Sequence, residues 1–446
     1  MPCATQPSGC GGTIIYERKS KMFLTRFRKK AAMPEESNRI NGWKDMYEGK
    51  HPSGVTTLNL PAAISSELAR LVTIEMKAEV SGSEAAKAAL EKLVPKLRSD
   101  TELACALGGG MFRPYFKNGG ISVEFIPADR FVITSFDDEG APDGCIFTDR
   151  FKDGDRYYTR LEEHKIIPEG YEVTNRAYVS KTVSADFGTP VNLSSVERWK
   201  NLSERVVIQK IHRPLFVYFK MPFADNKSMT SKLGVSVFDR ASGLIAEADK
   251  QFSRLLWEFE GGELAIDASV DALRFNERGV AEAPKLSKRL FRGLGIDAGD
   301  HDLYSVFSPE LRDESIINGL NEILMRIEDT CGLARGTFSN AVCEAKTATE
   351  IKILNQRSYS TVCDIQNALK FALERVAEVC AEIAALYGIE PLGKPQLSVE
   401  FDDSIVTDRG AEFEEKLTLV QAEIMTADEM REWYFGKKSL SPEQRE

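Results

Sequence analysis

The residues best suited to chemistry are acidic and lie toward the end of the chain. Asp402 and Asp403 are adjacent, and Glu400 precedes them by two positions. Paired carboxylates can hold Mg²⁺ for phosphodiester chemistry, so one interpretation is a metal-dependent nuclease or nucleotidyl-transferring enzyme. No other acidic cluster is set out to complete a two-metal site, and aspartates of this kind also form turns and helix caps. We therefore favour the turn, and we predict no metal site and no catalytic residue.

A second candidate is the glycine run Gly108, Gly109 and Gly110. A phosphate-binding loop would follow a strand and end in Gly-Lys-Ser/Thr, and both signals are missing here. Close backbone packing or a sharp turn explains the three glycines better.

Cysteine and histidine do not form a pattern typical of metal ligands. The chain has eight cysteines and four histidines, with no CxxC pair and no histidine near a cysteine or another histidine. A zinc site is therefore not expected, and we predict no cofactor. Scattered cysteines in a long chain indicate reduced thiols in a cytoplasm.

The charge and composition bound the class of protein. The net charge is −10 in 446 residues, and 42% of the residues are hydrophobic, as in ordinary globular proteins. An acidic protein does not grip nucleic acid through phosphate neutralisation, although acidic walls would let DNA slide past. No apolar run is long enough to cross a bilayer, so no membrane contact is expected.

The first 33 residues differ from the rest. Basic side chains are frequent and apolar ones are few, without a hydrophobic segment of signal-peptide length. We interpret residues 1–33 as a solvated N-terminal arm rather than a nucleic-acid-binding tail, and Met22 could be the natural start.

The element that must organise the chain is a long helix over residues 347–387. Apolar side chains recur every three or four residues, and Gly388 and Pro391 end the pattern. About forty residues at about 1.5 Å each give a rod of about 60 Å. Such a rod either spans a large protein or packs against copies of itself; an ordinary long core helix is the simpler alternative.

Helices and strands precede this rod. Helical periodicity covers residues 60–77, 85–97 and 101–107, and period-2 patterns follow at 121–126, 130–134, 145–151, 157–164 and 171–178. The short Gly- and Asp-rich spacers between these strands predict an antiparallel meander, and thus an α+β fold rather than a doubly wound nucleotide fold.

A helix–insertion–helix pattern comes next. Residues 214–222 predict a strand. A helix is expected to begin at Gly234 to Phe238 and to continue to Phe259. Along this helix, charged residues are spaced so that they can form ion pairs: Glu247, Lys250, Arg254 and Glu258. Short strand-like pieces fill 262–312. Asp313 is expected to cap a further helix that Gly332 closes. This order predicts a stalk with a compact tip, and residues 333–346 follow as a polar, mobile loop.

Several stretches, in this order, resemble the portal proteins of tailed double-stranded DNA bacteriophages. They span about residues 38–436, and their order along one chain makes the resemblance specific. The stretches are 214–222 with 233–238, 309–312, 332–338 followed by 346–351, and 402–405.

The resemblance implies a phage portal fold with a division of the chain into functional parts. These would be a wing (34–234), stem helix 1 (235–261), a clip (262–312), stem helix 2 (313–332), a tunnel loop (333–346), a long wing or spine helix (347–387) and a small helical crown (388–446).

The resemblance also implies a non-enzymatic ring, dodecameric in the virion, at the portal vertex of the capsid and assembled in the host bacterial cytoplasm. Expected partners are the terminase motor, the head–tail adaptor, the major capsid or scaffolding protein, and double-stranded DNA passing through the channel. Candidate DNA contacts in the tunnel loop are Arg335, Asn340 and Lys346. Basic clip candidates are Lys285, Lys288, Arg289 and Arg292, and ring-interface candidates are Leu369, Val376 and Ile383.

Overall fold

The protein is described from a computed structural model. The structure describes residues 14–15, 34–74, 76–182, 187–263, 265–269, 274–275, 281–282, 291–294, 304–307, 309–340, 348–401, 409–422 and 424–435. Its helices are α2 (Pro34–Tyr47), α3 (Leu60–Thr73), α4 (Glu84–Leu93), α5 (Leu97–Leu107), α6 (Ser242–Gly261), α7 (Asp313–Cys331), α8 (Ala348–Leu386), α9 (Arg409–Gln421) and α10 (Ala427–Phe435). Among the described residues, no helix is both long and apolar enough to cross a membrane.

The strands fall into separate sheets. They are β1 (Ile14–Ile15), β2 (Lys77–Ser81), β3 (Gly109–Lys117), β4 (Gly120–Pro127), β5 (Phe131–Phe136), β6 (Pro142–Asp153), β7 (Arg156–Ile167), β8 (Gly170–Ser180), β9 (Thr189–Val191), β10 (Arg205–Gln209), β11 (Val217–Lys220), β12 (Ala265–Ser269), β13 (Arg274–Phe275), β14 (Ala281–Glu282), β15 (Phe291–Leu294), β16 (Tyr304–Phe307) and β17 (Gln396–Glu400).

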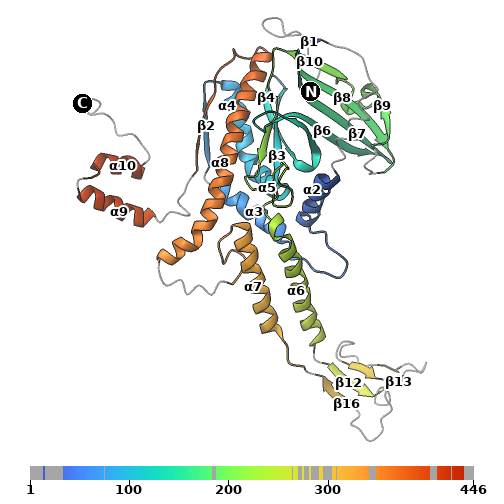
Figure 1. The fold of residues 1–446 in the computed structure, drawn as a ribbon. Coiled ribbons are helices and arrows are strands. Elements are labelled where there is room, and N and C mark those ends of the chain that lie inside the picture. Colours follow the sequence, from blue (N-terminus) through green and yellow to red (C-terminus); the bar gives the residue numbers. More distant parts are fainter. Residues whose placement is uncertain are drawn as a thin grey trace.

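The predicted antiparallel meander is confirmed for β5 to β8, whereas the first strand predicted in it, 121–126, lies in β4 and pairs with β3 in a separate sheet. The larger sheet has the order β1-β10-β8-β7-β6-β5, with β9 on β8, and β5 to β8 are joined in antiparallel register. A smaller antiparallel sheet has the order β11-β3-β4. Both sheets and helices α2 to α5 form the body at the upper part of Figure 1, so the fold is α+β as expected.

The glycine run is a site of close backbone packing. Gly108 ends α5 in a left-handed conformation with φ of 83°, and β3 begins at Gly109. A Cβ atom on Gly234 would lie 1.8 Å from the carbonyl oxygen of Gly108, so this crossing excludes any side chain. The glycines therefore serve packing, as predicted, and not phosphate binding.

The long helix α8 runs along the body, within one residue of its predicted ends at both sides. At about 1.5 Å per residue, its 39 residues span about 58 Å. It contacts α3, α4, β3 and β11, and much of its apolar stripe is buried in the main core of the protein. The tight spacing of the stripe thus reflects packing within one chain.

Helices α6 and α7 leave the body side by side as a stalk, and the small sheet of β12, β15 and β16 lies at its far end (Figure 1). We call α6 and α7 the stalk and these strands the tip. The predicted helix–insertion–helix order is confirmed, but α6 begins at Ser242 rather than at Gly234, because Asp239–Ala241 form a 3₁₀ turn, η5. Asp313 is the first residue of α7 and makes no capping bond.

Two further expectations needed correction. Helix α3 ends at Thr73, and the residues from Lys77 form β2, which pairs with β17 in antiparallel register. Most of the predicted N-terminal arm lies outside the described residues, but Ile14 and Ile15 form β1, which pairs with β10.

Candidate functional site

The stalk and the loop that follows it form the candidate site, and buried carboxylates hold them in place. Asp239, Asp249, Glu258 and Glu328 are at most 8% exposed, although each belongs to the stalk or to the turn that enters it. A buried carboxylate is costly unless hydrogen bonds or ion pairs compensate it, so the partners of each acid show what it stabilises.

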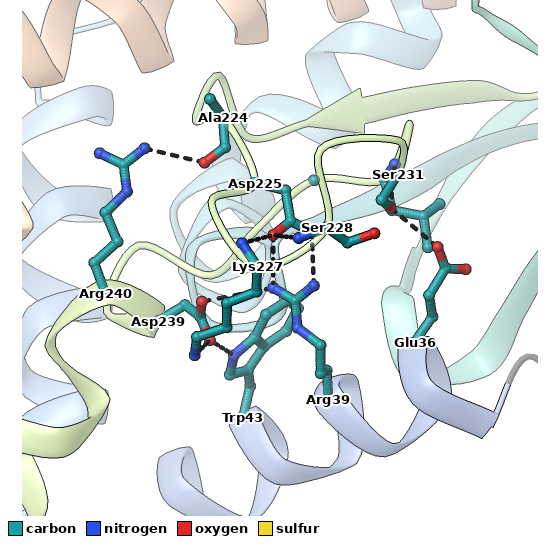
Figure 2. A network of polar contacts seen from close by, with 12 residues as sticks. Glu36, Arg39, Trp43, Ala224, Asp225, Lys227, Ser228, Ser231, Asp239 and Arg240 are labelled. Atoms are coloured by element: carbon teal, nitrogen blue, oxygen red, sulfur yellow. Dashed lines mark hydrogen bonds and ion pairs between the residues drawn. The ribbon is translucent and has the colours of Figure 1, made fainter.

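Asp239 joins the root of the stalk to α2 (Figure 2). Its Oδ1 accepts hydrogen bonds from Trp43 Nε1 at 2.6 Å and from Lys227 Nζ at 3.0 Å. The Arg39 guanidinium lies 3.5 Å from Oδ2. Two side chains from α2 and one from the loop before the stalk therefore converge on Asp239, the first residue of η5.

The loop before the stalk is held by a second acid, Asp225. Arg39 donates to both of its carboxylate oxygens, at 2.6 and 3.2 Å, and the backbone N–H groups of Lys227 and Ser228 donate to Oδ1. Burial raises the pKa of Asp225, but the bonds from Arg39 and the backbone outweigh burial and leave that pKa below its usual value. This loop is thus tied to α2 by charge-assisted bonds.

Asp249 fixes the middle of α6 to the body. Its carboxylate accepts hydrogen bonds from the backbone N–H of Leu58 at 2.8 Å and from the hydroxyl of Thr57 at 3.0 Å. The segment before α3 is therefore fastened along one side of the stalk.

Glu258 joins the two stalk helices near the tip. It accepts from the backbone N–H of Arg312 at 3.0 Å, and from the Nε and an Nη of the same guanidinium at 3.1 and 2.8 Å. The Arg312 guanidinium holds the pKa of Glu258 below its usual value. The ion pairs expected along α6 are thus only partly present: Lys250 contacts Glu247 at 2.6 Å, whereas Glu258 pairs with Arg312, the residue before α7.

Glu328, which is 0% exposed, holds the first part of the predicted tunnel loop. Its Oε1 accepts from the backbone N–H groups of Phe338 at 2.5 Å and Ser339 at 2.8 Å. Its Oε2 accepts from the Ser339 hydroxyl at 2.7 Å and the Gly336 N–H at 3.2 Å. Residues 333–340 therefore form a fixed turn against α7, contrary to the mobile loop that we expected from their polarity.

Sequence reasoning missed Glu328, although a signal was present. Positions 320, 324, 327 and 331 of α7 hold the apolar residues that face the core. Position 328 follows 324 by four residues and so falls on the same face, where an acid is out of place unless something pairs with it.

Two of the proposed DNA contacts lie in this turn, where the side chain of Arg335 and the backbone of Asn340 have partners. Arg335 donates to Asp329 through Nε at 3.2 Å and an Nη at 2.7 Å, and this carboxylate raises the pKa of Arg335. The backbone of Asn340 bonds to Asn321 in both directions, at 2.6 and 3.1 Å. A phosphate would have to compete with Asp329 for Arg335.

The other basic candidates fall outside the turn. Lys346 and the clip residues Lys285, Lys288 and Arg289 lie outside the described residues, and of Arg292 only its place in β15 is described.

The acidic residues of the nuclease interpretation are described only in part. The Asp402–Asp403 pair lies outside the described residues, whereas Glu400 ends β17 opposite Lys77. Within the described part of the chain, no group of three or more His, Cys, Asp or Glu residues could hold a metal ion. The nuclease interpretation stays a prediction that magnesium-dependent cleavage assays on Asp402→Ala and Asp403→Ala would test.

The ring-interface residues need correction. Leu369 and Val376 are 0% exposed and Ile383 is 1% exposed, because the same chain covers them. They are therefore not a surface that a second copy can contact. Among the residues of α8 whose side chains are described, Phe371 is a large apolar side chain that is exposed, at 67%.

The comparison with known protein families agrees with this geometry. Residues 101–436 match the family described as "Phage portal protein, SPP1 Gp6-like". The match covers most of the chain, including the strands β3 to β11, the stalk, the turn held by Glu328 and α8. The chain belongs to this family of phage portal proteins.

Other comparisons add little. Among solved structures, one chain from "Neck of native GTA particle computed with C12 symmetry" is similar over 88% of this chain and 92% of its own length, with 10% sequence identity and a TM-score of 0.43. A search of curated proteins found no match. The family assignment therefore depends only on the match of residues 101–436 to the portal protein family.

Proposed function

We propose that the protein is the subunit of a portal ring at one vertex of a phage capsid, through which viral DNA enters during packaging and leaves during ejection. The observation that carries this proposal is membership of the portal family over residues 101–436. The stalk, tip, turn and long helix succeed one another in the order that a portal subunit requires.

The charge of the stalk supports passage of DNA rather than tight binding. Helix α7 carries five acidic residues and one basic residue, and α6 carries four acidic and two basic residues. A negatively charged channel wall repels the phosphates of DNA, so a duplex would not be retained along the stalk. The Arg335–Asp329 pair is consistent with this, because its positive charge is already balanced.

Exposed apolar side chains on the stalk support assembly with further copies. Trp257 is 63% exposed, Phe259 46%, Ile317 43% and Leu311 42%. Large exposed apolar groups on and beside the two stalk helices are typical of residues that another chain covers. In this proposal the exposed apolar residues of the stalk, and not the buried residues of α8, form the contacts between neighbouring subunits. The subunits close into a ring that is dodecameric in the virion.

The parts of the chain take roles accordingly. The body is the wing, the tip is the clip that meets the head–tail adaptor, residues 333–346 are the tunnel loop, and residues 388–446 are the crown. The terminase motor docks on the ring from outside, and the major capsid or scaffolding protein surrounds the wing. The role is structural, without a catalytic step, and the site of action is the virion.

The proposal predicts that heads assembled without this protein contain no packaged DNA, and that supplying the chain restores filled heads. Nuclease-protected DNA in purified heads measures this outcome. DNA-filled heads in its absence would contradict the proposal.

A further inference from the structure

A pocket of about 430 Å³ lies where the two sheets of the body meet. Residues of β3, β4, β6 and β7 line it, together with Arg130 in the 3₁₀ turn η2 (Ala128–Arg130) and residues between 198 and 202. The volume falls within the range of pockets that hold ligands, about 300–1,000 Å³. These strands belong to the body and not to the stalk (Figure 1), so the pocket is independent of the function proposed above.

The surface that this pocket offers to a ligand is mostly polar. Phe147, Trp199 and Ile126 belong to its lining, but all three side chains are buried by the protein itself. They shape the walls and leave little apolar surface for an occupant. The occupant should therefore be hydrophilic.

Arginine dominates the charge of the pocket. The buried carboxylate of Glu162 lies 2.9 Å from the guanidinium groups of both Arg113 and Arg160. Burial raises the pKa of Glu162, but these two guanidinium groups outweigh burial and hold that pKa well below its usual value. Together with Glu162, four positive groups face three negative ones and leave one positive charge, in a protein whose net charge is −10. The charged groups of the lining are Arg113, Arg130, Arg160, Arg198, Glu124 and Asp149.

Two exposed arginines hold the charge that is available to a ligand. The side chain of Arg130 makes no hydrogen bond or ion pair within the described residues. The guanidinium of Arg198 lies over the ring of Phe151, with its Cζ atom 5.3 Å from the ring centroid, and this contact orients it. Its distance to the Asp149 carboxylate is 3.4 Å, longer than the about 2.7–2.9 Å of a charge-assisted hydrogen bond.

Arg160 adds a buried donor that lacks an acceptor. Its side chain is 9% exposed, and its Nη atoms contact Glu162 at 2.9 Å and Asn175 at 3.0 Å. Its Nε atom has no hydrogen-bond partner in the described part of the chain. Because a buried charged group is destabilising until its donors are paired, this guanidinium favours an acceptor in the pocket that it lines.

We propose that this pocket binds a small hydrophilic oxyanion, either a phosphate or a carboxylate. The anion pairs with the guanidinium groups of Arg130 and Arg198 and lies beside that of Arg160. Arginine suits this task because its planar guanidinium can donate to two oxygens of one anion at once. The exposed amide of Asn201, which also lines the pocket, can donate a further hydrogen bond.

Ligand-observed NMR on the full-length protein tests the proposal. The probes are inorganic phosphate and acetate, each compared with a neutral counterpart, trimethyl phosphate and acetamide. We expect at least one of the two anions to bind about tenfold or more tightly than its counterpart, as for the loss of one hydrogen bond to a charged group. The anion that binds more tightly shows whether the ligand group is a phosphate or a carboxylate.

Variants locate the binding. Arg130→Gln and Arg198→Gln should each weaken binding of the preferred anion several-fold, and both arginines are exposed, so the fold should be retained. Arg156→Gln is the matched control, because Arg156 is exposed on β7 outside the pocket, and it should leave binding unchanged.

Three results would overturn the proposal. The first is that neither anion binds more tightly than its neutral counterpart. The second is that binding is unchanged in both pocket variants. The third is tighter binding of the dinucleotide TpT than of either small anion, which would favour nucleic acid as the ligand.

Discussion

Replacing Glu328 by alanine tests whether this acid fixes the turn at residues 333–340. The backbone N–H groups of Phe338 and Ser339 have the Glu328 carboxylate as their acceptor, at 2.5 and 2.8 Å. A buried donor without an acceptor costs about 1–3 kcal/mol, so two such donors cost about 2 kcal/mol or more if the turn stays in place. The turn would instead detach and expose these groups to water.

Hydrogen–deuterium exchange measures this detachment directly. A loss of about 2 kcal/mol corresponds to about thirtyfold faster exchange of the Phe338 and Ser339 amides. Glu328→Gln should have a smaller effect, because one amide oxygen can still accept both N–H groups. Glu322→Ala is the control, since Glu322 is exposed on the same helix. If these amides exchange equally slowly in the parent and in Glu328→Ala, the turn is fixed by something else and the reasoning fails.

Three further predictions concern stability. Val376→Asp should lower the free energy of unfolding by about 3 kcal/mol or more, because it buries a charge in the core, whereas Phe371→Asp on the exposed side of α8 should leave the unfolding temperature nearly unchanged. Gly234→Ala should lower the free energy of unfolding by about 2 kcal/mol or more in chemical denaturation, because the added Cβ meets a backbone oxygen; a fully stable variant would refute the crossing. The pKa of Glu258 is lowered in the folded state, so its pairing stabilises the protein above the ordinary pKa of 4.5, and the stabilisation disappears as the pH falls through the lower folded value. Unfolding curves between about pH 5 and pH 2 should show this loss in the parent and a smaller one in Arg312→Gln; equal pH dependence would contradict it.

Local patterns predicted much of the fold. The stripe from Val362 to Ile383 defined α8, and turn residues separated β4 to β8, because helix and strand periodicity are set by nearby residues. The capping box at the start of α10 is another feature that neighbouring residues set: the Thr426 N–H donates to Glu429 at 2.8 Å, and the Glu429 N–H donates to the Thr426 hydroxyl at 3.2 Å.

Features that depend on distant residues could not be predicted in this way. Strand β2 exists because it pairs with β17, more than three hundred residues further along the chain. The late start of α6 follows from Asp239, whose partners Trp43 and Lys227 lie on other segments. The sequence also could not show that the stripe of α8 is covered by the same chain, since an apolar stripe looks alike whether it faces a core or a neighbouring subunit.

The central claim is that the chain acts as one wedge of a closed ring. Electron microscopy of the purified full-length protein, combined with mass measurement of the same sample, tests it most directly. The account predicts closed rings with a central passage, whose mass is a whole-number multiple of the 49.7 kDa chain, and it predicts that Trp257→Asp on the exposed stalk reduces their number. Particles that remain monomeric under conditions of capsid assembly, or assemblies without a central passage, would contradict it.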